Sequence, residues 1–389
     1  MKRVYVAVLL ALYCLLSFVA APQASAESTP TPVPEATPAP TSTPAPIRLG
    51  GVDVPWNATS LDLSAIQPED VPEAMAALEV LPQVQAVKLT DEAGASPWTL
   101  EQAWELMERR PELQVEYTAT AFGVSFSLTD EVVSFNNIDL SDRVGELRAL
   151  LPYMARVGRL DMEYCKIPDK QMAALREDFP SPKIVWRVFV GVYSCRTDAI
   201  MVRFSESNDA MRLYDKDVQP LIYCNEMKYL DLGHNRLSSA YFAAYMPDLE
   251  VCILAVERNL EDISALASCP KLEFLEIFSG KITDLSVLAE CKKLRHLNIS
   301  CNQITDITPL FSLRLRRLWM TQTNVPLTQI EAFREKFPHC EMNNTAPDPA
   351  AGTWRYKGNA MAPRYALLRQ QFCYDHMEIS SYSEPPQFD

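Results

Sequence analysis

Two neighbouring stretches of this chain repeat one pattern. Residues 272–288 read LEFLEIFSGKITDLSVL and residues 294–310 read LRHLNISCNQITDITPL. Leucine or isoleucine occupies the first, fourth and sixth places of both, and Ile-Thr-Asp follows in step. A tandem repeat of this length predicts that each copy is one structural unit, which buries its apolar side against the next copy. The constant residues therefore face neighbouring copies, and the variable ones are free to face something else.

The pattern extends in both directions as L-x-x-L-x-L-x-x-N-x-L. Five copies begin 21 to 23 residues apart, at Met227, Leu249, Leu272, Leu294 and Leu315. The template resembles the leucine-rich repeat family, and the short I-x-D-[IL]-x-x-L return segment resembles the internalin-type subclass of bacteria. The resemblance implies an α/β fold: a leucine-rich-repeat solenoid with a parallel concave sheet, here with its regular array over residues 225–342.

The ninth place of the repeat carries asparagine in two copies, Asn235 and Asn302. An asparagine there can satisfy turn carbonyls that stacking would leave without partners. Gly280 replaces it in the third copy, so we expect that turn to lose such bonds, and Glu257 stands at this place in the second copy. The aspartates of the return segments, Asp284 and Asp306, are expected to cap them.

Longer and more divergent units precede the array. Residues 167–180 (IPDKQMAALREDFP) resemble residues 325–338 (VPLTQIEAFREKFP), and residues 99–111 share the spacing of Gln and Pro. Apolar residues three and four apart predict an amphipathic helix in each. We therefore expect irregular strand–helix units of the same kind over residues 48–224, continuous with the array, with a loop or an extra helix pair at residues 196–224.

The N-terminus predicts export. Lys2 and Arg3 precede an apolar run and Ala24-Ser25-Ala26 offers a cleavage site, so residues 1–26 are expected to be a secretory signal peptide. An uncleaved anchor is the alternative, because the run is just long enough to cross a bilayer. Residues 27–47 are rich in Pro and Thr and predict a disordered linker. We expect a secreted or cell-surface protein, not inserted in the membrane after signal removal.

Composition and motifs argue against several functions. The formal net charge of −14 disfavours nucleic acid as a partner. No zinc-protease, phosphate-loop or dinucleotide-binding motif occurs, so we expect no catalytic residues, no metal site and no cofactor. His296 and Cys301 share a repeat, but at opposite ends of a short strand. An enzyme with an unrecognised site in residues 51–224 remains the least favoured alternative.

Nine cysteines remain once Cys14 leaves with the signal. Cys269 and Cys291 occupy the same place in successive copies, and Cys252 stands where other copies have leucine. Small buried residues are expected at such positions. We therefore predict that most of the thiols are free.

The variable places of the strands define the candidate site. Places three, five and seven project from the open face of the predicted sheet, where they combine aromatic and aliphatic residues with a few charged ones. A face of this composition usually marks a partner site. The candidate binding residues are Tyr229, Asp231, Val251, Ile253, Phe274, Glu276, Phe278, His296, Asn298, Arg317 and Trp319.

Two functions are compatible with this face. Binding of a protein or peptide, as the family resemblance implies, predicts that Phe274, Phe278 and Trp319 are exposed side by side. A structural spacer or scaffold of the cell envelope predicts instead that the chain's own N-terminal or C-terminal extension covers them. The C-terminal residues 343–389 contain several aromatic residues and are expected to form a cap of the solenoid end or a tail. The oligomeric state is open.

Overall fold

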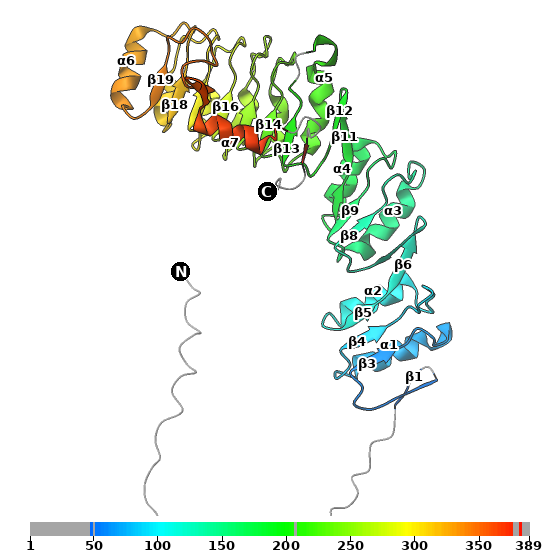
Figure 1. Ribbon diagram of the computed structural model, residues 1–389. Helices are drawn as coiled ribbons and strands as arrows, with labels where there is room; N and C mark the ends of the chain where they lie inside the picture. Colours follow the sequence, from blue (N-terminus) through cyan, green and yellow to red (C-terminus); the bar gives the residue numbers. More distant parts are fainter. Residues whose placement is uncertain (1–46, 50, 206–207, 376–380, 383–389) are drawn as a thin grey trace, which may run out of the picture. The chain divides into compact units, whose positions relative to one another are not determined.

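The computed structural model describes residues 47–49, 51–205, 208–375 and 381–382. The predicted signal peptide and almost all of the predicted linker lie outside these residues. Seven parallel strands form the main sheet (Figure 1). In spatial order they are β19 (Glu341–Asn343), β18 (Arg317–Trp319), β17 (His296–Asn298), β16 (Phe274–Glu276), β15 (Val251–Ile253), β14 (Tyr229–Asp231) and β13 (Met201–Arg203). A short β22 (Ser381–Tyr382) pairs antiparallel with β13.

The fourth place of each repeat forms a column behind this sheet. Leu275, Leu297 and Leu318 pair in register on adjacent strands, and each is completely buried. Leu230 and Cys252 continue the column in register. The predicted leucine-rich-repeat solenoid is confirmed, because the repeated residues bury apolar surface against the equivalent residues of the next copy.

Return segments complete each repeat on the side of this core. They are the short helices η4 (Gln219–Tyr223), η5 (Tyr241–Tyr245), η6 (Ser264–Ser268), η7 (Ser286–Glu290) and η8 (Thr308–Ser312), followed by the longer α6 (Leu327–Lys336). The predicted caps are present: the carboxylates of Asp284 and Asp306 accept the backbone N–H groups of Ser286 and Thr308, each at 2.8 Å.

The ninth place of the repeat holds the turns together, as expected for asparagine. The amide of Asn302 donates to the carbonyls of Ile277 and Ile299 at 2.8 and 3.0 Å. Glu257 stands at this place in the second copy, and its carboxylate accepts the backbone N–H groups of Asn235 and Leu237 at 2.5 and 2.8 Å. An acceptor thus replaces a donor at this turn, and burial raises the pKa of Glu257 to about 8.

Two larger units precede the array. The first contains β3 (Ser60–Asp62), β4 (Ala86–Lys88) and β5 (Gln114–Glu116) with helices α1 (Val71–Glu79) and α2 (Leu100–Arg109). The second contains β8 (Val132–Ser134), β9 (Arg159–Asp161) and β10 (Lys183–Val185) with α3 (Val144–Leu150) and α4 (Asp169–Asp178). Helices α2, α4 and α6 confirm the three helices expected from the sequence. A small hairpin, β1 (Ile47–Leu49) and β2 (Val52–Val54), precedes the first unit.

The expected continuity of these units with the array is wrong at the level of the sheet. Each unit ends in an antiparallel hairpin, β6 (Thr118–Ala121) with β7 (Val124–Ser127), and β11 (Arg187–Val190) with β12 (Tyr193–Arg196). Each hairpin breaks the parallel hydrogen bonding, so the strands form three separate sheets. Residues 196–224 are also more than a loop, because they supply β13, the first parallel strand of the main sheet, as well as α5 (Asp215–Val218). The hydrophobic core nevertheless runs from Leu49 to Phe333.

Candidate functional site

The variable face is defined here as the face of β14 to β18 that carries places three, five and seven of the repeats. Its aromatic residues are buried: Phe274 is 1%, Phe278 4% and Trp319 0% exposed. Of the two arrangements considered from the sequence, exposure of these residues and coverage by the chain's own extension, coverage is the one observed. The remaining candidates at these places, from Tyr229 to Asn298, are buried or half-buried as well.

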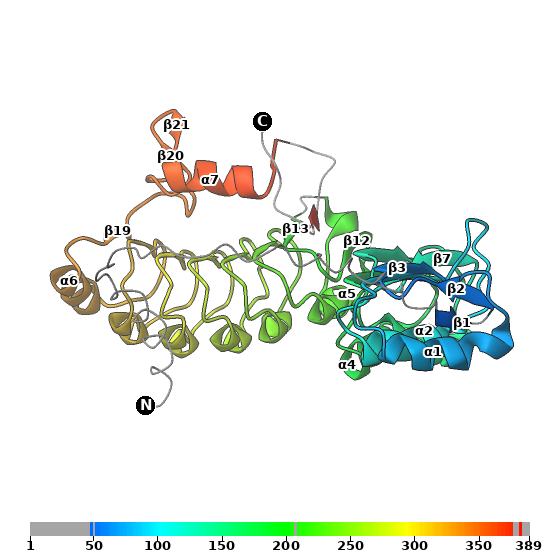
Figure 2. The same cartoon turned by 90° about the horizontal axis from the view of Figure 1, so that it is seen from below.

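The residues that cover this face belong to the C-terminal end of the chain. Residues 346–375, named here the cover segment, leave the sheet after β19 and run back across it as α7 (Pro363–Gln371) toward β13. In Figure 2, α7 lies on one side of the strands and the return segments lie on the other. The segment thus covers the variable face, whereas the sequence suggested a cap at the end of the solenoid.

A second apolar core, separate from the repeat core, joins the two. Trp354 is 1% exposed, with ring centroids 5.2 Å from Phe274 and 5.4 Å from Trp319. Toward β13, the ring of Phe372 meets that of Tyr229 at 6.2 Å. Other members are Val251, Ile253 and Phe278 from the strands, and Tyr365 and Leu368 from α7. This packing removes a large apolar area of both the strands and the cover segment from water. The hydrophobic effect therefore favours coverage of the variable face.

Two buried carboxylates of the variable face have partners in the cover segment. Glu276 is fully buried and accepts hydrogen bonds from the indole N–H of Trp354 and, at 3.1 Å, from the guanidinium of Arg355. Asp231 accepts one from the hydroxyl of Tyr374 and one from the backbone N–H of Gly233 at 2.9 Å. Burial raises the pKa of Asp231. Burial opposes the charge of Arg355, but the Glu276 carboxylate raises its pKa overall.

A third group of contacts joins side chains of the strands to main-chain carbonyls of the cover segment. The side-chain amide of Asn298 donates to the carbonyl of Pro349 and the indole of Trp319 to that of Ala351, both at 2.9 Å. Arg317 donates to the carbonyls of Thr353 and, at 3.2 Å, of Trp354. These donors lie on β17 and β18 at variable places of the repeat. The sheet therefore already holds a stretch of peptide by its backbone.

Comparison with known proteins agrees with the repeat geometry. A family model that describes two copies of the leucine-rich repeat matches residues 270–313. The chain carries leucine-rich repeats. No curated protein matches the sequence.

Three solved structures show what the fold is similar to. An internalin of Listeria monocytogenes, inlF, is 18% identical, with 71% of this chain and 67% of that chain covered and a TM-score of 0.34. Internalin C2 of the same organism is 17% identical, with 52% and 70% covered and a TM-score of 0.29. The TLR13–ssRNA13 complex is 14% identical, with 71% and 34% covered and a TM-score of 0.24. The fold assignment rests on this chain's own repeats and strand register.

His296 is the one histidine among the candidate residues. Its ring stacks on Phe274 at 6.1 Å, and its Nδ1 atom is buried with no hydrogen-bond partner among the described residues. Burial, together with Arg364 and Arg317, lowers its pKa to about 3, so the ring is neutral at physiological pH. Cys301 contacts Gln322 at 3.5 Å. The histidine is thus part of the packed face of the leucine-rich repeats.

The partners of the variable face were not predicted, although the aromatic residues of the C-terminus are evident from the sequence. The partners include Trp354, Arg355 and Tyr374, which bond to the two buried carboxylates of the strands. One signal was available: a basic, aromatic stretch in an acidic chain. It could not show which part of the array the stretch would meet, because it does not repeat.

The larger units before the array carry hollows and a polar network. One open hollow of about 720 Å³ is lined by residues of β3 to β5, including Lys88 and Glu116, and one of about 580 Å³ lies beside α4 and β10. Neither lining contains a histidine or a cysteine. The ionisable residues Lys183 and Glu226 of the second hollow pair with each other at 2.7 Å.

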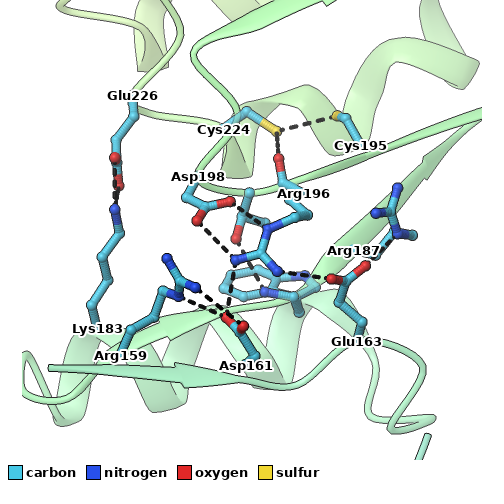
Figure 3. A network of polar contacts seen from close by, with 12 residues as sticks. Arg159, Asp161, Glu163, Lys183, Arg187, Cys195, Arg196, Asp198, Cys224 and Glu226 are labelled. Atoms are coloured by element: carbon cyan, nitrogen blue, oxygen red, sulfur yellow. Dashed lines mark hydrogen bonds and ion pairs between the residues drawn. The ribbon is translucent and has the colours of Figure 1, made fainter. Parts of the chain in front are cut away.

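Figure 3 shows the network that joins the second hairpin to its sheet. The guanidinium of Arg196 on β12 pairs with Asp161 at 2.9 Å, Glu163 at 2.8 Å and Asp198 at 2.9 Å. These carboxylates raise its pKa despite burial. The sulfur atoms of Cys195 and Cys224 lie 3.8 Å apart nearby, and all nine described cysteines are free thiols. Arg159 also pairs with Asp161 at 3.0 Å and Arg187 with Glu163 at 2.5 Å, so three arginines match the three carboxylates.

Among residues 47–49, 51–205, 208–375 and 381–382, no helix is both long and apolar enough to span a bilayer. No group of three His, Cys, Asp or Glu side chains among them is arranged to hold a metal ion.

Proposed function

We propose that this chain is a non-enzymatic, secreted or cell-surface leucine-rich repeat protein that binds a peptide segment of a protein partner on its variable face. The observation that carries the proposal is the set of side-chain donors, Asn298, Arg317 and Trp319, bonded to main-chain carbonyls of the cover segment. Donors of this kind can bind peptides of many sequences, because every peptide presents main-chain carbonyl groups. In this proposal the variable face is a peptide-binding face, and the cover segment of the same chain occupies it.

A scaffold without a partner is the alternative, and the burial of Phe274, Phe278 and Trp319 favours it. The two functions differ in one property. A binding face exchanges its occupant, whereas in a scaffold the cover segment is a permanent part of the core. Export is proposed from residues 1–26 alone; sequencing the N-terminus of the mature protein would check it, with residue 27 as the expected start.

The test of peptide binding uses the full chain with Trp354→Ala, which removes the largest contact of the cover segment while leaving the variable face intact. This chain is panned against a random peptide-display library, and enriched peptides are measured by fluorescence anisotropy. We expect Arg317→Ala, added to the same chain, to weaken them by about tenfold, the effect of losing an interface anchor. Arg148→Ala, which breaks an exposed ion pair with Asp178, is the control.

Two results would argue for the scaffold. One is a folded Trp354→Ala chain that enriches no peptide. The other is enrichment of peptides whose affinity is the same with Arg317→Ala as with Arg148→Ala, since these peptides would bind elsewhere on the surface.

A further inference from the structure

The cover segment differs in charge from the rest of the chain. It contains four basic residues, Arg355, Lys357, Arg364 and Arg369, and two acidic ones, Asp348 and Asp375, so its net charge is four minus two, or +2. The whole chain carries −14. The variable face contributes the buried carboxylates Asp231 and Glu276. Charge complementarity of this kind selects partners and excludes others.

The strongest contacts of the cover segment centre on two adjacent residues. Trp354 lies among Phe274, Trp319 and Arg317, whose guanidinium is 4.8 Å from the indole ring. Arg355 places its guanidinium over the ring of Phe278 at 5.6 Å while bonding to Glu276 at 3.1 Å. Buried tryptophan and arginine are the residues that most often anchor an interface.

Glu276 bonds to both of these adjacent residues. One carboxylate oxygen accepts the Trp354 indole N–H and the other accepts the Arg355 guanidinium. A carboxylate that is 0% exposed is costly unless both a hydrogen-bond donor and a cation meet it. The side-chain donors on β17 and β18 bond to main-chain carbonyls, which every peptide has, so the Glu276 carboxylate is where the face distinguishes one peptide from another.

We propose that the variable face recognises basic peptides that carry a tryptophan followed directly by an arginine, and that residues 346–375 occupy the face in cis because they carry this pair. The ligand class rests on the proposed function, since it specifies which peptides the face binds. A partner segment with the same pair binds by displacing the cover segment. Glu276 is the specificity-determining residue.

The experiment uses the full chain with Trp354→Ala and Arg355→Ala, which weakens the occupant in cis. A fluorescent synthetic peptide of residues 346–375 is titrated against it. Three matched peptides serve for comparison: one with Trp354→Ala, one with Arg355→Ala, and one of shuffled sequence that keeps the composition and the +2 charge. Circular dichroism verifies that the chain is folded. If this double variant does not fold, Trp354→Phe replaces it, because phenylalanine keeps apolar packing but has no N–H for Glu276.

We expect the natural peptide to bind at least about tenfold more tightly than the shuffled one, and each single substitution to lose about tenfold, as for interface anchors. Glu276→Gln in the chain is expected to remove the preference for arginine and to keep the dependence on Arg317. Equal affinity of the natural and shuffled peptides overturns the ligand class but leaves peptide binding standing, provided that Arg317→Ala still weakens it. If no peptide binds to the folded chain, both proposals are wrong.

Discussion

The main sheet has two buried faces that are buried in different ways. Behind the sheet, the same residue types recur on each strand, so Leu275 packs on Leu297 and Leu297 on Leu318. On the variable face no two strands carry the same set, and one continuous stretch of chain, the cover segment, lies against all of them. The first face is closed by its neighbours in the array, and the second by a segment that follows the array.

Because the two faces are closed in different ways, only the variable face could exchange its contacts. Removing one residue of the repeat core opens a cavity inside the array, since nothing else can fill it. Removing the cover segment would instead uncover a surface whose strands remain paired. We therefore expect the repeat core to control global stability and the variable face to control local opening.

The largest expected effect is on the repeat core. Leu297→Ala should lower the free energy of unfolding by about 2–5 kcal/mol, because it leaves a cavity in a fully buried column. Denaturant unfolding measures it. Leu327→Ala is the control, since that side chain is 69% exposed on α6 and should change stability by less than about 0.5 kcal/mol. Equal losses for the two would break the comparison.

The second effect separates local from global stability. Trp354→Ala should cost less global stability than the about 2–5 kcal/mol of a full core truncation, because the cover segment can detach while the array stays folded. Hydrogen exchange should show lost protection in α7 but unchanged protection in β15 to β17. Trp56→Ala, at an exposed tryptophan, is the matched control. Protection lost equally in the strands would make both faces one cooperative core.

The third prediction concerns a turn of the array. Restoring the repeat asparagine by Gly280→Asn should destabilise by about 1–3 kcal/mol, as expected for overpacking. A Cβ atom at Gly280 would lie 2.9 Å from the Asn302 side chain and 3.1 Å from the carbonyl of Leu260. Thr323→Asn, at the same repeat place, is expected to be nearly neutral. A thermal melt that rises with Gly280→Asn would show that the turn has room to adjust.

The fourth prediction depends on pH and on the variable face. The pKa of His296 is about 3 in the folded chain and near 6.5 when unfolded, so between these values the unfolded state binds more protons. Stability of the face should therefore fall as pH decreases from 6.5 toward 3. His296→Gln should flatten this part of the pH profile of α7 exchange, whereas His339→Gln, at an exposed position, should not. An unchanged slope with His296→Gln would assign the acid sensitivity to another group.

The array could be predicted because its contacts are repetitive. The period of 21 to 23 residues, the leucine column and the caps at Asp284 and Asp306 all follow from residues that recur at fixed places. Glu257 shows a limit of this approach. The repeat template assigns no role to a glutamate at this place, yet its side chain reaches the N–H groups of Asn235 and Leu237.

The candidate site was predicted only in part. Its residues on the strands were identified by their places in the repeat, but their burial was not. The hairpins β6–β7 and β11–β12 divide the strands into three sheets. They were not predicted, because neither carries the repeat pattern.

The array, the helices at the ends of the long units and the places of the variable residues all follow from the amino-acid sequence. These depend on contacts between equivalent positions of neighbouring copies, so periodicity reveals them. The contact between the cover segment and the variable face is evident only in the tertiary structure. Trp354 contacts Glu276 across 78 residues, and Tyr374 contacts Asp231 across 143. Such contacts occur once each, and their formation depends on the burial of large aromatic area and on the pairing of two carboxylates, neither of which has a period to detect.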